Sequence, residues 1–359
     1  MVKKPIKVLM LGPSPRSHGG MATVINSILK NASVSEDVEI EMWPTYMDGS
    51  LLRRVAYSSV REIAFHFTPH NYDIYHVHTA SRTSFWRKCR YIRTLRRSAC
   101  KVILHVHGGG FIDFWDKCTS RQKQKIRSCF SMVDKVIVLS IEWLELFVDR
   151  SICDRKKLAV LPNAVDIPDQ NVTDYSKNAV LFLGRLDKNK SPDVLLNAAK
   201  LVVELHPDAR FEFVGDGDIS IYESQAKDLG VSYACNFVGW ASGRKLENIL
   251  KSNSIYCLPS KREAMPMSLL EAMSYGLVAV ATNQGSIPTV IKDNYSGRLV
   301  EVDDHVGLAR VLSSLMDSVE TKRRLGESGR AYVEQQYGIT EYAKKISELY
   351  QEVLCERDL

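Results

Sequence analysis

Short apolar runs alternate along the chain with longer segments in which apolar residues recur every three or four positions. In the first half the apolar runs are IKVLMLG (6–12), YDIYHVHT (72–79), KVILHVHG (101–108), DKVIVLS (134–140) and KLAVLPN (157–163). The second half continues with AVLFLGR (179–185), RFEFVGDG (210–217), CNFVGW (235–240), SIYCLPS (254–260) and GLVAVAT (276–282). Runs of this kind, separated by helix-length segments, predict parallel strands in sheets covered by helices on both faces.

With 359 residues, the chain is too long for one ordinary core. The polar, turn-rich segment from Pro162 to Asn178 has no periodicity and predicts a link between two domains. The expected fold class is α/β, with two doubly wound, Rossmann-like parallel-sheet domains facing across a cleft. We assign residues 1–165 to the first domain, 166–337 to the second, and 338–359 to a closing helix that returns to the first. Ligands in such sheets bind at the carboxyl ends of the strands.

Composition narrows the class of protein. The 45% hydrophobic and 25% charged content is typical of a soluble globular protein. No segment approaches the roughly 20 apolar residues of a membrane span, and the run VLML (8–11) is too short for a secretion signal. Eight cysteines occur singly, which indicates reduced thiols. We expect a cytoplasmic protein, peripheral on the cytoplasmic face of the inner membrane.

The formal charge of +6 is unevenly spread, because the first 165 residues are basic and the remainder is acidic. Cations interleave with aromatic residues between Ser81 and Lys101, on a predicted helix. This pattern suits adsorption to anionic lipid headgroups; a solvated basic helix with an apolar core face is the alternative. No nucleic-acid-binding motif accompanies the charge, so we expect no nucleic acid partner. The candidates for acceptor or membrane contact are Arg87, Lys88, Arg90, Arg93, Arg96 and Arg97.

Two predicted strands end in residues suited to phosphate. Gly19 and Gly20 follow the first strand and open a helix, where backbone N–H groups and the helix N-terminus favour an anion. A tight turn that binds nothing is the alternative. Arg185 follows a strand directly and Lys190 lies five residues on, before a helix that begins near Pro192. Two cations at such a junction suit a diphosphate, although they could also be solvated surface cations.

The stretch REAMPMSLLEAMSYG (262–276) places two acids around a predicted helix start. Pro266 is expected at the first helical position and Gly276 at the C-terminal cap. Glu271, one turn into the helix, and Glu263, in the preceding loop, could each accept hydrogen bonds from two neighbouring hydroxyls of a sugar ring. The alternative is a capping or ion-pairing role for both acids.

These motifs together indicate a family. HGGMATVI, ILHVHGGGF, VIVLS, VLPNAVD, LFLGRLDKNKSPDVLLNA, FVGDGD, FVGW and LPSKREAMPMSLLEAMSYGLVAVATNQGSIPTVI occur in that order over nearly the whole chain. The chain resembles the retaining glycosyltransferases of family 4, which have the two-domain GT-B fold. The resemblance implies an acceptor-binding domain at residues 1–165 and a nucleotide-sugar-binding domain at 166–337. Ala264 and Pro266 depart from many members, and we expect donor specificity to be set there.

The resemblance also implies a role for each residue. Glu271 would bind the ribose hydroxyls and Glu263 the transferred sugar, while Arg185 and Lys190 neutralise the diphosphate. His107, in HVHGGG, matches a histidine beside the transferred sugar. The implied catalytic residues are His107, Arg185, Lys190 and Glu263. The implied donor-binding residues are Gly19, Gly20, Arg185, Lys190, Gly239, Trp240, Glu263, Met265, Met267, Ser268 and Glu271. His76, His78 and His105 are weaker candidates, and alternation puts His105 on the same face as His107.

The expected reaction moves a sugar from a nucleotide-diphosphate sugar, UDP favoured over GDP, to a hydroxyl of a saccharide acceptor. The anomeric configuration is retained, and a lipid-linked acceptor in cell-surface polysaccharide, lipopolysaccharide or glycoconjugate biosynthesis is the hypothesis. The resemblance also implies metal-independent catalysis, so we expect neither a metal nor another cofactor. The alternatives are a GT-B nucleotide-sugar epimerase and a non-catalytic saccharide-binding protein.

Overall fold

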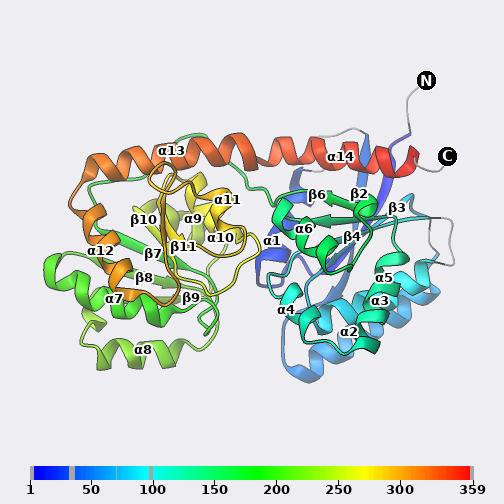
Figure 1. Cartoon of the computed structure of the whole chain (residues 1–359), viewed down its shortest axis with the longest axis horizontal. Helices are drawn as coiled ribbons and strands as arrows, with labels where there is room; N and C mark the ends of the chain where they lie inside the picture. The colour runs from blue at the N-terminus through cyan, green and yellow to red at the C-terminus, as the bar shows by residue number, and fades with distance from the viewer. Residues whose placement is uncertain (1–3, 32–36, 70, 97–99, 356–359) are drawn as a thin grey trace. The chain divides into compact units, whose positions relative to one another are not determined.

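The computed structural model describes residues 4–31, 37–69, 71–96 and 100–355. The chain divides into two compact units, Met1–Ala164 with Ile339–Leu359, and Val165–Gly338 (Figure 1). Each unit is built on a six-stranded sheet in which all paired strands run parallel. The predicted α/β fold class is confirmed. No helix among these described residues is long and apolar enough to cross a membrane.

The first unit has the strand order β2-β1-β3-β4-β5-β6, so the order reverses between β1 and β3. A reversal of this kind is where ligands bind in doubly wound sheets. Its strands are β1 (Ile6–Pro13), β2 (Val38–Tyr46), β3 (Ile74–Thr79), β4 (Lys101–Val106), β5 (Lys135–Val138) and β6 (Leu158–Val160). Its helices are α1 (Gly20–Asn31), α2 (Leu51–Phe67), α3 (Thr83–Leu95), α4 (Phe111–Asp116), α5 (Ser120–Ser131), α6 (Ile141–Asp149) and α14 (Ile339–Cys355).

The second unit has the order β12-β11-β10-β7-β8-β9, and its reversal falls between β7 and β10. Its strands are β7 (Ala179–Leu183), β8 (Arg210–Val214), β9 (Cys235–Gly239), β10 (Ile255–Leu258), β11 (Val278–Thr282) and β12 (Arg298–Val300). Its helices are α7 (Pro192–Leu205), α8 (Ile219–Asp228), α9 (Gly243–Ser252), α10 (Met267–Ser274), α11 (Ile287–Val290), α12 (His305–Met316) and α13 (Val319–Tyr337). On opposite sides of this unit, α7 packs beside α12 and α10 packs beside α13 (Figure 1).

Burial explains which strands the apolar pattern predicts. Every residue of β10 and β11 is buried, because helices cover both faces of a central parallel strand. The two strands that the pattern misses, β2 and β12, each lie at one edge of their sheet. In β2 the exposed Glu39 and Glu41 interrupt the apolar run, and β12 has only three residues. Exposure in β2 and the short length of β12 therefore leave no continuous apolar run to detect.

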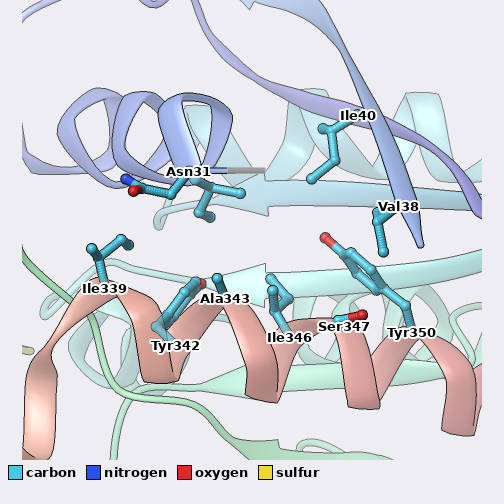
Figure 2. Close-up of a pocket in the computed structure, with 10 residues that line it drawn as sticks. Asn31, Val38, Ile40, Ile339, Tyr342, Ala343, Ile346, Ser347 and Tyr350 are labelled. Carbon is cyan, nitrogen blue, oxygen red and sulfur yellow. The ribbon is translucent and has the colours of Figure 1, made fainter. Parts of the chain in front are cut away.

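The closing helix α14 belongs to the first unit, as expected. Figure 2 shows Ile339, Tyr342, Ile346 and Tyr350 on the side of α14 that faces α1 and β2, around a small apolar hollow. Polar contacts continue along the same helix: Lys135 of β5 forms an ion pair with Glu352 at 2.7 Å. The helix is therefore fixed both by apolar packing and by charge.

The predicted link from Pro162 to Asn178 is wrong over most of its length. Tyr175 is buried, and its hydroxyl donates to the carbonyl oxygen of Gly276 at 2.9 Å. The backbone N–H of Val165 donates to the carbonyl oxygen of Tyr337 at 2.9 Å. These contacts make residues 165–178 part of the second unit, because an aperiodic segment can pack as well as a regular one.

Candidate active site

The carboxyl edge of the second sheet brings two loops together at the reversal between β7 and β10. After β7 the chain passes through Arg185, whose side chain is 65% exposed. The loop then folds back, because Asp187 Oδ1 accepts the backbone N–H groups of Asn189 and Lys190, each at 3.0 Å. Helix α7 starts at Pro192. The strand-loop-helix junction that the sequence predicts for two cations is present.

Three contacts join this loop to the one that follows β10. The backbone N–H of Lys261 donates to the carbonyl oxygen of Asn189 at 2.8 Å, and the Asn189 side chain donates to the carbonyl oxygen of Arg262 at 3.1 Å. Lys190 Nζ lies 2.5 Å from Glu263 Oε1, with only 20% and 8% of the two side chains exposed. An ammonium group has three donors, so Lys190 retains hydrogen-bonding capacity beyond this ion pair.

A glycine permits a third loop to reach the same place. Gly285, after β11, has φ +56°, and a Cβ there would lie 1.8 Å from the carbonyl oxygen of Glu263. The next residue, Ser286, donates its backbone N–H to the carbonyl oxygen of Ala264 at 3.2 Å. Any side chain at position 285 would push the loop that carries Glu263 out of place.

Helix α10 begins one residue later than predicted. Pro266 is the N-cap residue, with φ −70° and ψ 123°, and Met267 is the first helical residue. The extended ψ of Pro266 places it outside the helix. The helix ends at Ser274, and Gly276 adopts φ 90° just beyond the cap. First-turn N–H groups have no acceptor within a helix, so those of Met267 and Ser268 are available at the helix start.

Both predicted glutamates lie near Tyr256 of β10. Tyr256 is fully buried and its pKa is raised well above the usual value, mainly by burial, with smaller contributions from the charges of Glu263 and Glu271. Its hydroxyl lies 2.8 Å from the Ser268 hydroxyl. Burial also raises the pKa of Glu271 to about 7. The carboxyl therefore changes charge near neutral pH, which suits a hydrogen-bonding role more than a surface ion pair.

The remaining donor-site candidates lie further along the same edge. Gly239 ends β9 with φ 74°, and its carbonyl oxygen accepts the N–H of Gly215 at 2.9 Å. Trp240 follows and is 39% exposed. Met265 and Met267 are buried, at 4% and 6% exposure, so their side chains pack inward and only their backbone could meet a ligand.

In the first unit, the glycine loop occupies the position that the sequence predicts. It follows β1 at the reversal of strand order, and α1 begins at Gly20. Gly19 adopts φ 111°, which side chains rarely permit. The loop is fixed on one side by Asn26, whose side chain donates to the carbonyl oxygen of Pro15 at 2.8 Å. Helix α1 thus presents its N-terminus at the carboxyl edge of the sheet.

His107 belongs to a cluster of four histidines from β3 and the end of β4. His78 Nδ1 lies 2.8 Å from His107 Nε2, and His76 Nε2 lies 3.2 Å from His105 Nδ1. The rings of His105 and His107 lie 3.9 Å apart between centroids. His76 also contacts the hydroxyl of Tyr350 on α14 at 2.7 Å. Burial lowers the pKa of His76 and of His107 to about 3, so both are neutral at pH 7.

Strand alternation in the sequence places His105 and His107 on one face of a strand but misses the cluster with His76 and His78. The signal is the H-x-H pattern repeated on two strands that pair in register, with His78 opposite His105. Nitrogen atoms of His76, His78 and His105 lie within 4.8 Å of one another. The contacts that the structure shows among these rings are hydrogen bonds between ring nitrogens and ring stacking.

The predicted basic helix is α3, and one of its candidates is wrong. Lys88 is 1% exposed and donates from Nζ to Thr45 Oγ1, whose hydroxyl in turn donates to the carbonyl oxygen of Gly12. A side chain on the inward face of α3 cannot reach a membrane surface or an acceptor. Arg87 is partly buried as well, with its guanidinium 5.1 Å from the ring centroid of Tyr46.

The other basic candidates remain on the surface where they are described. Arg90, Arg93 and Arg96 are exposed, and Arg90 pairs with Glu62 of α2 at 2.5 Å. Arg97 lies outside the described residues. Among the described residues, the exposed basic surface is therefore formed by fewer of the predicted cations: Arg90, Arg93 and Arg96.

We expect Lys88→Met to stabilise the protein at pH 7 by about 1–3 kcal/mol. Burial lowers the pKa of Lys88 well below its usual value, so folding carries a free-energy cost at pH values where this lysine is protonated in the unfolded chain. That cost shrinks as the pH rises toward the unfolded pKa, and the gain from Lys88→Met should shrink between pH 7 and pH 9. Urea unfolding at both pH values measures it; a destabilised variant would contradict the prediction.

Two family models and several known proteins match this chain. Residues 165–332 match the family described as Glycosyl transferases group 1, and residues 23–168 match Glycosyltransferase Family 4. An Escherichia coli relative, UDP-Gal:alpha-D-GlcNAc-diphosphoundecaprenol alpha-1,3-galactosyltransferase, is 26% identical over 259 residues. The match covers 62% of this chain and 66% of the relative, just under two thirds of its length.

Two solved structures show the same fold. Sucrose-phosphate synthase from Thermosynechococcus elongatus superimposes with a TM-score of 0.81 at 16% identity, covering 98% of this chain and 100% of that one. Anabaena HepE in complex with UDP and glucose gives 0.74 at 15% identity, covering 97% and 100%. The two family matches run together from residue 23 to residue 332. The chain therefore belongs to the glycosyltransferases of GT-B fold, with a Glycosyltransferase Family 4 match in its first half and a Glycosyl transferases group 1 match in its second.

Proposed function

We propose that this protein transfers a sugar, with retention of configuration, from a UDP-sugar to a hydroxyl of a lipid-linked saccharide in cell-surface polysaccharide synthesis. The observation that carries the proposal is the ion pair of Lys190 with Glu263, on the same loop as the exposed Arg185, at the strand-order reversal of the second unit. Family membership supports the reaction class. The E. coli relative, whose name states a UDP-Gal donor and a diphosphoundecaprenol-linked acceptor, supports the substrates.

In the proposed donor complex, the cations and the start of α10 bind the diphosphate. Arg185 is exposed directly after β7, and Lys190 has unused donors beside Glu263. The carboxylate of Glu271 would accept hydrogen bonds from the ribose hydroxyls, and Glu263 would address the transferred sugar. Trp240 would border the base. Because charge develops on the departing diphosphate, these fixed cations stabilise the transition state more than the bound donor.

The proposed reaction has no protein nucleophile. The bond between the anomeric carbon and the diphosphate oxygen breaks, and the acceptor oxygen bonds to the same face of that carbon. The acceptor proton passes to the departing phosphate oxygen. Glu263 is engaged with Lys190 at 2.5 Å, which suits holding a sugar hydroxyl better than attacking carbon. His107, neutral at pH 7, would donate or accept one hydrogen bond to the transferred sugar.

Thermal shift with UDP, GDP and ADP sugars tests the donor, because a bound ligand raises apparent stability by mass action. We expect the largest shift with a UDP-sugar and an unchanged shift after chelation of divalent metals. A polyprenyl-diphosphate-linked saccharide then tests transfer, with the anomeric proton coupling of the product reporting retention. Turnover of the donor without acceptor would instead indicate the epimerase, and no nucleotide binding would indicate the non-catalytic alternative.

A further inference from the structure

Helix α2 packs on the first unit with the side that carries Ser58, Arg61 and Phe65, and exposes most of its large apolar side chains. Six of the fifteen exposed large apolar side chains among the described residues lie on this one helix, and Leu52 and Phe67 are 84% and 79% exposed. These six, which we call the α2 apolar face, are Leu51, Leu52, Val55, Val60, Ile63 and Phe67. Leu52, Val60, Ile63 and Phe67, together with Ala56, are spaced three or four residues apart and form a continuous stripe along the helix. A surface helix normally buries such a stripe.

Specific contacts hold the helix in this inverted orientation. The guanidinium of Arg61 lies 3.7 Å from the ring centroid of Trp43, and its Nε donates to the carbonyl oxygen of Pro44 at 3.1 Å. Phe65 is buried among aromatic rings, with Tyr91 at 4.9 Å between centroids. Ser50 caps the helix by accepting the backbone N–H of Arg53. The apolar face therefore points outward, because the opposite face of α2 is held by these contacts with the first unit.

The charges around the α2 apolar face indicate what covers it. Arg53 on α2 is exposed, as are Arg93 on the neighbouring α3 and Arg96 at the C-terminal cap of α3. Glu62 is the one carboxylate on the two helices, and it is already paired with Arg90. An apolar surface bordered by arginines complements an anionic bilayer. Two copies of this face placed together would bring their arginines into repulsion.

We propose that α2 inserts its apolar face into an anionic lipid surface, with Arg53, Arg93 and Arg96 contacting the headgroups. This inference rests on the proposed function, because a lipid-linked acceptor requires the enzyme to work at a bilayer. The insertion element is then α2, and the predicted basic helix α3 supplies the flanking charge. Figure 1 shows α2 and α3 together on the side of the first unit opposite α14.

Flotation with vesicles made of equal parts phosphatidylglycerol and phosphatidylcholine tests the proposal. The wild-type chain should bind, and Leu52→Gln with Ile63→Gln should lower the partition coefficient on the order of tenfold or more. Glutamine keeps the helix propensity of the replaced positions. The matched control is Leu205→Gln with Ile221→Gln, two residues of the second unit that are 71% and 61% exposed; it should bind as wild type.

The charged part is tested separately. Arg93→Gln with Arg96→Gln, or vesicles of phosphatidylcholine alone, should weaken binding, and the effect should fade at high salt. Unchanged binding of the Leu52/Ile63 variant, or no wild-type binding to anionic vesicles, would overturn the proposal. A wild-type chain that forms a concentration-dependent dimer and does not bind vesicles would also overturn the proposal. If the Leu52/Ile63 variant abolished that dimer, the α2 apolar face would be a contact with a second copy of the chain. In the Leu52/Ile63 variant, the thermal shift with UDP and the transfer to a water-soluble acceptor should be unchanged. A loss of either activity in the wild-type chain would instead contradict the proposed function.

Discussion

Arg185→Ala and Lys190→Ala are each expected to lower kcat on the order of 100-fold or more, with a smaller change in KM. Each substitution removes a cation from the place where the proposed diphosphate leaving group gains charge, and such interactions are strongest in the transition state. Initial rates with a UDP-sugar and a soluble acceptor measure the effect. Lys188→Ala is the matched control, because Lys188 is an exposed lysine of the same loop and should leave the rate unchanged.

The two substitutions should differ in stability. Arg185 is largely exposed and Arg185→Ala should unfold as wild type, whereas Lys190→Ala leaves Glu263 nearly buried without its partner. We expect the Lys190 variant to lose roughly 1–3 kcal/mol. Adding Glu263→Ala should restore most of that stability without restoring turnover. Near-normal kcat in both single variants would contradict the assigned phosphate site.

Glu271→Gln is expected to stabilise the free protein and weaken donor binding at the same time. Burial raises the folded-state pKa of Glu271 to about 7 from 4.5, so the folded state binds more protons between those values. Stability contributed by this group is present below about pH 4.5 and is lost as the pH rises through about 7. Since the side chain is only partly buried, we expect a gain of roughly 1–2 kcal/mol at pH 8 and little at pH 5.

The affinity of the same Glu271→Gln variant for the donor should fall, although its stability rises. A carboxylate accepts hydrogen bonds from both ribose hydroxyls, while the amide nitrogen of glutamine cannot accept. Glu271→Gln should therefore weaken UDP binding about 10-fold to 100-fold at pH 8, and wild-type affinity should fall as the pH drops through 7. Calorimetry at pH 6, 7 and 8 measures both, with Glu223→Gln, an exposed glutamate of α8, as control. Equal affinity in wild type and variant at pH 8 would remove Glu271 from the donor site.

The sequence predicts the part of the site that is carried by single segments. The strand before Arg185, the helix after Lys190 and the glycine loop before α1 all follow from local apolar runs, proline and glycine. The pairing of Lys190 with Glu263 does not, because the two residues are 73 positions apart and meet only when β7 and β10 pair. The histidine cluster likewise depends on the register of β3 with β4.

By itself, the sequence determined the two parallel-sheet domains and the family, because buried strands and their end loops leave continuous local signals. Only the tertiary structure decided which way the helices face. Lys88 lies on a basic helix and is buried, while Leu52 and Phe67 lie on an apolar stripe and are exposed. Periodicity defines the faces of a helix, but distant partners such as Thr45 for Lys88 and Trp43 for Arg61 choose the face that packs.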